Sequence, residues 1–144
     1  TKEERFRINE HILTTIKMLD SLPYLEELAQ IPRYATTYLE TMNGSGYPRG
    51  LTAEKLSVPE RILMLANVFE ALTAAERPYK KAKTLSVAIF ILHQLVEDEL
   101  IDRDVFELFL TSGIYRQYAE RFMAPEQIDE VDIDRFLREE DRYI

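Results

Sequence analysis

Few residues in this chain have side chains that could bind a metal ion or take part in catalysis. The histidines are His11 and His93, and the sequence contains no cysteine. Disulfides, thiol catalysis and cysteine-based zinc sites are therefore excluded. Imidazole and carboxylate groups remain as ligands, so a metal centre would have to be built from histidines and acidic residues.

A glycine-rich loop contains three of the four glycines, in the run Asn43-Gly44-Ser45-Gly46-Tyr47-Pro48-Arg49-Gly50-Leu51. Paired glycines let the backbone turn sharply and approach a ligand or another chain closely. Taken alone, such a loop is more often a plain turn between helices. Its functional meaning therefore depends on the residues around it.

Polar residues also follow this loop on and after the next predicted helix. Asn67 and Glu70 are separated by one helical step and share a face. Arg77 and Lys80 come just after this helix, and their charge suits contacts with phosphate groups. For Arg77 and Lys80, the simpler alternative is that they are solvated at a helix end and complement the helix dipole.

The elements that must position these residues are helices, because apolar residues recur with a helical period throughout the chain. The pattern predicts an all-α helical bundle. Ser57 with Glu60, Thr84 and Asp102 are expected to cap helix N-termini. The helices are predicted over residues 3–19, 24–31, 33–42, 57–75, 85–97, 103–110 and 114–123. We divide the chain into a domain at 1–124 and an acidic tail at 125–144, expected to form a helix that packs on that domain.

Composition limits the partners of the chain. It has 144 residues and a formal net charge of -8, which argues against broad contact with nucleic acid or an anionic membrane. The longest apolar stretch, at 85–96, is too short to span a bilayer. The absence of cysteine fits the cytoplasm, where we expect the protein. The sequence begins without Met and directly with an amphipathic segment, so we expect a fragment of a longer protein.

Three features in order carry a family resemblance: the Gly46-Tyr47-Pro48 triplet, the helix at 61–73, and the run at 77–82. Together they resemble the HD-GYP domain, the cyclic di-GMP phosphodiesterase branch of the HD metal-dependent phosphohydrolases, over about residues 3–135. The resemblance implies an HD-domain-like helical bundle. It also implies divalent ions such as Fe or Mn in active members, and nucleotide contacts through Tyr47, Arg77 and Lys80.

The chain departs from the family pattern at the metal ligands. Where the family has His-His-Glu, this chain has Tyr38-Leu39-Glu40, and where the family has a ligand Asp it has Asn67. Glu70 keeps the second acid of the helix motif, and His11 matches a family histidine. The His-Asp pair that names the family would lie before Thr1. Hydrolysis of this kind needs at least two metals around a bridging water. We therefore expect no cofactor, no catalytic residue and no dinuclear site here.

These observations predict a catalytically degenerate HD-GYP-like module, serving as a regulatory or protein-interaction domain of a larger bacterial signal-transduction protein. One alternative is a metal-dependent phosphohydrolase, a cyclic di-GMP phosphodiesterase, completed by upstream residues. Another is a non-catalytic sensor of cyclic di-GMP. The expected partner is a protein, such as a diguanylate cyclase-type domain, or a second copy of this chain. The predicted contact residues are Gly44, Gly46, Tyr47, Pro48 and Arg49.

Overall fold

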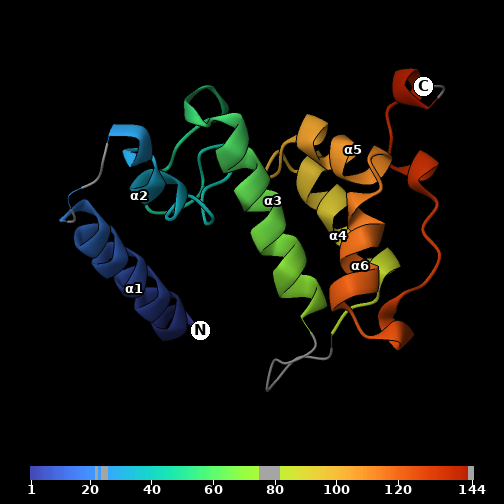
Figure 1. Ribbon diagram of the computed structural model, residues 1–144, viewed down its shortest axis with the longest axis horizontal. Coiled ribbons are helices and arrows are strands. Elements are labelled where there is room, and N and C mark those ends of the chain that lie inside the picture. Colours follow the sequence, from blue (N-terminus) through green and yellow to red (C-terminus); the bar gives the residue numbers. More distant parts are fainter. Residues whose placement is uncertain (22, 24–25, 75–81, 143–144) are drawn as a thin grey trace. The chain divides into compact units, whose positions relative to one another are not determined.

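The computed structural model describes residues 1–21, 23, 26–74 and 82–142 of the chain, and it is helical (Figure 1). The chain divides into two compact units, Thr1–Met64 and Leu65–Ile144. Its α-helices are α1 (Lys2–Asp20), α2 (Ile31–Tyr34), α3 (Val58–Thr73), α4 (Leu85–Glu97), α5 (Arg103–Thr111) and α6 (Ile114–Phe122). These two units do not correspond to the predicted domain at 1–124 and tail at 125–144. The predicted boundary after residue 124 stays a prediction.

No strand occurs in the described parts of the chain, where the β-type pairing is one isolated bridge between Asn43 and Thr52. The all-α prediction is therefore confirmed. Among the described residues, no helix is long and apolar enough to cross a membrane.

The first unit combines a long helix with short ones. Thr1 caps α1 in a capping box with Glu4, and α1 packs against α2. The chain then passes through the glycine-rich loop to the 3-10 turn η2 (Ala53–Lys55) and the start of α3. Arg61 on α3 donates hydrogen bonds to the carbonyl oxygens of Leu56 and Ala53. The segment at 53–56, which follows the glycine-rich loop, therefore lies beside the first turns of α3.

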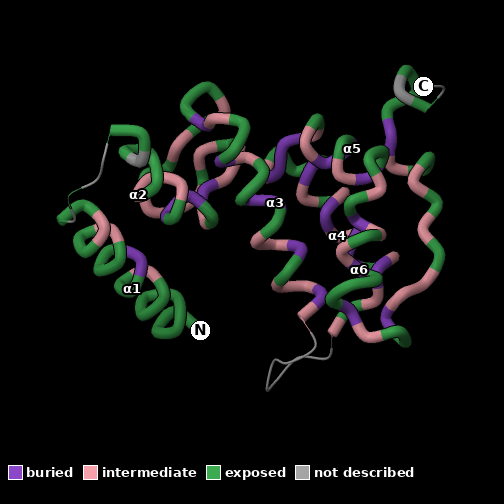
Figure 2. The backbone as a smooth tube through the Cα atoms, viewed as in Figure 1, coloured by how far each residue is buried: buried purple, intermediate pink, exposed green. Residues whose placement is uncertain are grey.

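The second unit is organised by apolar packing among α4, α5 and α6, which lie side by side (Figure 1). Thr84 and Asp102 cap α4 and α5 as predicted, each accepting a hydrogen bond from the backbone three residues on. Figure 2 shows buried positions running along α4 and α5. The side chains fully buried there are Leu85, Ala88, Ile89, Leu92, Phe106 and Leu110.

The predicted helix over residues 33–42 is wrong beyond Tyr34. The hydroxyl of Thr36 donates to the carbonyl oxygens of Pro32 and Arg33, and that of Thr37 donates to the carbonyl of Arg33. Side chains that bond locally to the backbone compete with helix formation. The predicted helix over 24–31 is also reduced, in its described part, to the 3-10 turn η1 (Glu26–Leu28) and the first residue of α2.

The acidic tail is not the single helix that the sequence predicted. It contains three 3-10 turns, η3 (Pro125–Gln127), η4 (Ile133–Arg135) and η5 (Glu139–Asp141). The amide of Gln127 donates to the carbonyls of Thr73 and Lys83, and Asp129 accepts hydrogen bonds from Ser86. These contacts with distant residues hold the segment in a non-helical path. The tail still contributes to the core, since Leu137 is buried.

Candidate functional site

The glycine-rich loop depends on glycine in two different ways. Gly44 and Gly50 have φ angles of 83° and 59°, in the left-handed region that favours glycine. Gly46 is required by space instead, because a Cβ there would lie 2.5 Å from the Cα of Glu40 and 2.6 Å from the carbonyl oxygen of Leu39. The N–H of Tyr47 donates to that same carbonyl at 3.1 Å. The loop is thus packed directly onto the backbone of residues 39–41.

Glu40 fixes the far side of the loop. Its side chain is buried, and its two carboxylate oxygens accept hydrogen bonds from the backbone N–H groups of Arg49 at 2.7 Å and Leu51 at 3.0 Å. Hydrogen bonds to an ionised acceptor are among the stronger ones in proteins. Glu40 therefore clamps the loop from inside. Sequence reasoning placed Glu40 among the degenerate metal positions and missed this role, because no local pattern links an acid to N–H groups nine and eleven residues later.

A second carboxylate holds the segment below the loop. Glu60 is buried, and it accepts hydrogen bonds from Arg33 at 2.9 Å, from Thr37 at 2.9 Å and from both the N–H and the hydroxyl of Ser57. Burial alone would raise the pKa of Glu60, but the hydrogen bonds from Arg33, Ser57 and Thr37 outweigh it and lower the pKa below its ordinary value. Glu60 therefore stays ionised at neutral pH and joins α2 to α3.

Of the predicted interaction residues, Gly46 packs against the backbone of residues 39–41, whereas Tyr47, Pro48 and Arg49 are at least partly accessible. Tyr47 and Pro48 are half-buried, whereas Arg49 is exposed. The backbone of Arg49 is held by Glu40, and its guanidinium donates to the hydroxyl of Thr36 at 3.2 Å. A rigid backbone therefore presents an exposed cation beside an aromatic ring that is half accessible.

The other positions expected near a metal in the first unit do not form a ligand set. His11 is exposed on α1, Tyr38 is exposed and Leu39 is half-buried. Leucine offers no donor atom, a neutral tyrosine is a weak ligand, and both oxygens of Glu40 are bonded to the loop backbone. The run Tyr38-Leu39-Glu40 does not fit a divalent metal ion.

The remaining predicted site residues belong to the second unit or fall outside the described residues. On α3, Asn67 is half-buried and Glu70 is exposed. Arg77 and Lys80, the predicted phosphate contacts, lie outside the described residues. Within the described ranges, no three His, Asp or Glu side chains gather into a group that could hold a metal ion.

Comparison with known proteins points to one family. Residues 1–105 match the family described as HD domain. The chain is 35% identical over 91 residues to the 3'3'-cGAMP-specific phosphodiesterase 1 of Vibrio cholerae, covering 63% of this chain and 20% of that protein. It is 33% identical over 112 residues to the cyclic di-GMP phosphodiesterase of Thermotoga maritima, covering 76% of this chain and 29% of that protein.

A shorter match, 44% identical over 59 residues, covers 41% of this chain and 15% of the cyclic di-GMP phosphodiesterase response regulator RpfG of Xanthomonas campestris. The chain therefore spans less than a third of the length of each of these three relatives. The family match covers most of the chain, and the relatives are phosphodiesterases of cyclic dinucleotides, as the HD-GYP resemblance implies. The chain belongs to the HD domain family.

Proposed function

We propose that this chain is a catalytically degenerate HD-GYP-like module, serving as a cytoplasmic regulatory or protein-interaction domain of a larger bacterial signalling protein. The observation that carries the proposal is the clamp of Glu40. Its carboxylate is used by the loop backbone, and the two residues before it, Tyr38 and Leu39, supply no histidine. A phosphodiesterase that needs two metals around a bridging water would lack these ligands.

The names of the relatives support the alternative of an active metal-dependent phosphodiesterase that draws its ligands from elsewhere in the full-length protein. The two functions are separated by metal analysis of the full-length protein, together with hydrolysis assays on cyclic di-GMP and 3'3'-cGAMP in added Mn²⁺ or Fe²⁺. We expect less than one equivalent of metal and no turnover. Metal-dependent hydrolysis of either nucleotide would establish the enzyme. Tight binding in a nucleotide titration, without hydrolysis, would establish the other alternative, a non-catalytic sensor of cyclic di-GMP.

The loop is the surface that we propose for the partner. An exposed arginine beside a half-buried tyrosine suits an interface hot spot, and a pre-formed loop loses little ordering entropy on binding. The proposed partner is a diguanylate cyclase-type domain or a second copy of this chain. Both are testable with purified proteins, by calorimetry for the former and sedimentation velocity for the latter.

The test compares a Tyr47→Ala, Arg49→Ala double variant with Arg7→Ala, which removes an exposed arginine from α1. We expect the double variant to weaken association by about tenfold or more, because hot-spot residues each contribute above about 1 kcal/mol. Arg7→Ala should bind as the wild type does. Unchanged association with a melting temperature lowered by several degrees would show that the loop is structural only.

A further inference from the structure

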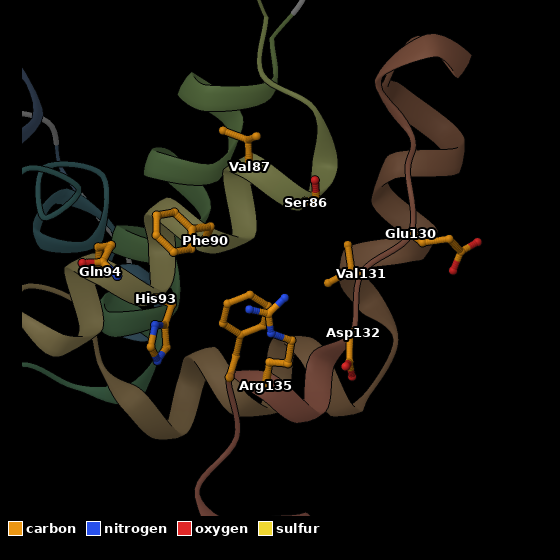
Figure 3. Close-up of a pocket in the computed structure, with 10 residues that line it drawn as sticks. Ser86, Val87, Phe90, His93, Gln94, Glu130, Val131, Asp132 and Arg135 are labelled. Carbon is orange, nitrogen blue, oxygen red and sulfur yellow. The ribbon is translucent and has the colours of Figure 1, made fainter.

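The second unit contains a cavity of about 450 Å³ between α4 and the extended part of the tail (Figure 3). A cavity of this size falls in the range that holds small organic ligands, about 300–1,000 Å³. Its apolar wall comes from α4 and the tail together, and its polar side chains include an imidazole and a guanidinium. The residues that matter for the inference are Val87, Phe90, His93, Val131, Arg135 and Phe136.

The tail segment that lines the cavity is anchored at both of its ends by hydrogen bonds to the helices. At one end, Asp129 accepts hydrogen bonds from the N–H of Ser86 at 2.8 Å and from its hydroxyl. Burial would raise the pKa of Asp129, but the bonds from Ser86 lower it below its ordinary value, so this anchor is charged at neutral pH. At the other end, the Arg138 side chain binds Asp104 and Glu107 of α5. The walls are therefore held in place without a ligand.

Aromatic and aliphatic groups line the cavity and remain open to solvent. Phe90 is 54% exposed on α4, and Val87 of the same helix is 42% exposed. Phe136 packs against the imidazole of His93 with ring centroids 5.3 Å apart. An aromatic ring that entered the cavity would contact these side chains and remove apolar surface from water.

The charges around the cavity favour an anion at one point. Glu130, Asp132 and Arg135 all line the cavity. Figure 3 shows the Arg135 side chain directed into it and the carboxylates of Glu130 and Asp132 at its edge. Within the described residues, no ion pair or side-chain hydrogen bond engages the Arg135 guanidinium. The imidazole of His93 is already beside a carboxylate, with its Nε2 3.4 Å from Glu97. Arg135 is thus a cation at an apolar wall with unused hydrogen-bonding capacity.

We propose that this cavity binds a small aromatic monocarboxylate, whose ring lies against Phe90 and Phe136 and whose carboxylate pairs with Arg135. The planar guanidinium can bind a carboxylate through two parallel hydrogen bonds. One negative charge is favoured over two, because Glu130 and Asp132 at the rim repel a dianion more strongly than a monoanion. The site shares no residue with the glycine-rich loop, and the inference does not depend on the proposed function.

The test uses three probes with the same ring and different charge: 2-naphthoate, 2-naphthamide and 2-naphthylmethylammonium. Binding to the ¹⁵N-labelled chain is measured by NMR titration, which also locates the site. We expect naphthoate to bind about tenfold more tightly than the neutral amide, with shifts in the amides of Val87, Phe90 and Val131. The ammonium probe should bind most weakly. Tightest binding by the ammonium probe, or shifts confined to residues outside the cavity, would overturn the proposal.

Two variants and a control refine the result. Arg135→Gln should remove the preference for naphthoate over naphthamide, and Phe90→Ser should weaken both probes. Arg121→Gln removes an exposed arginine of α6 outside the cavity and should change neither. Equal losses in the Arg135 and Arg121 variants would show that only overall charge attracts the anion, and the site would be rejected. Both test positions are exposed, so the melting temperature is expected to stay unchanged and confirms that each variant is folded.

Discussion

Charged side chains differ in their bonding between the loop region of the first unit and the cavity of the second. Glu40 and Glu60 are buried, and both oxygens of each carboxylate accept hydrogen bonds from donors of the same unit. Arg135 is exposed at an apolar wall, and no described side chain pairs with it. A buried charge whose bonding capacity is used within the protein stabilises a fold and offers little to a ligand. A charge left unpaired beside apolar surface is available for binding.

The largest effect expected from this comparison is the loss of the Glu40 clamp. Glu40→Ala leaves the part-buried N–H groups of Arg49 and Leu51 without this acceptor, at about 1–3 kcal/mol for each donor left unsatisfied. We expect the free energy of unfolding in urea to fall by about 4 kcal/mol in total. The exposed Glu54→Ala serves as the control and should change it by less than about 0.5 kcal/mol. A small loss in Glu40→Ala would mean that the loop is held by other contacts.

A somewhat smaller effect is expected where the loop backbone meets residues 39–41. In Gly46→Ala the new methyl group would lie 2.5–2.6 Å from backbone atoms of Leu39, Glu40 and Thr41. Backbone cannot move aside as a side chain can, so we expect a loss of about 3 kcal/mol.

Gly113→Ala is the matched comparison for this substitution, because Gly113 has φ of 77° but open space around its Cβ position. It should cost about 1–2 kcal/mol from backbone strain alone. Gly46 itself is not at positive φ. Equal losses for both variants in urea denaturation would therefore mean that the close approach at Gly46 costs no more than the backbone strain at Gly113.

For Glu60 we expect an intermediate effect on the free energy of unfolding, and this effect depends on pH. Its pKa is lowered from 4.5 in the folded protein, so the ionised carboxylate stabilises the fold above about pH 4.5. This stability is lost as the pH falls through the folded-state pKa. Glu60→Gln should cost about 2 kcal/mol at pH 7. It should also flatten the fall in stability as the pH drops from 7 to below 4.5. Unfolding curves measured across this range test both statements, and an acid dependence unchanged in the variant would assign it to other carboxylates.

The smallest effect on stability is expected at Arg135. Arg135→Gln should change the free energy of unfolding by less than about 0.5 kcal/mol, as is usual for a surface substitution away from structural contacts. Thermal unfolding with and without 2-naphthoate measures both quantities at once. Stabilisation by the ligand should disappear in the variant while the ligand-free curve stays the same. A marked loss without ligand would mean that Arg135 supports the fold and would remove the contrast with Glu40.

The sequence predicted features that depend on neighbouring residues better than features that depend on distant ones. Thr84 and Asp102 cap their helices through groups three residues away, which a local pattern captures. Glu40 bonds to N–H groups nine and eleven residues away, and Gln127 to carbonyls 54 and 44 residues away. No spacing rule indicates such partners.

Two of the mistaken helix predictions have the same origin. Residues 35–42 and the tail carry enough apolar residues to predict helices, but their polar side chains bond elsewhere. The hydroxyls of Thr36 and Thr37 donate hydrogen bonds to carbonyl oxygens of the preceding turn. Asp129 accepts a hydrogen bond from Ser86. The cavity was missed because it joins α4 to a segment about 40 residues away, and Arg135 forms part of no motif.

The contact between Gly46 and the backbone of Glu40 bears on how proteins are sorted by motif. At this position glycine is demanded by interatomic distance, whatever reaction the protein does or does not perform. Under the proposed function, a survey that counts Gly-Tyr-Pro triplets to estimate how many cyclic dinucleotide hydrolases a genome encodes would count this chain although it does not hydrolyse them. The two positions before Glu40 carry different information, because nothing in the loop geometry requires an imidazole there. A survey that also requires histidine at those two positions would distinguish chains that share only the loop structure from chains that carry the metal ligands.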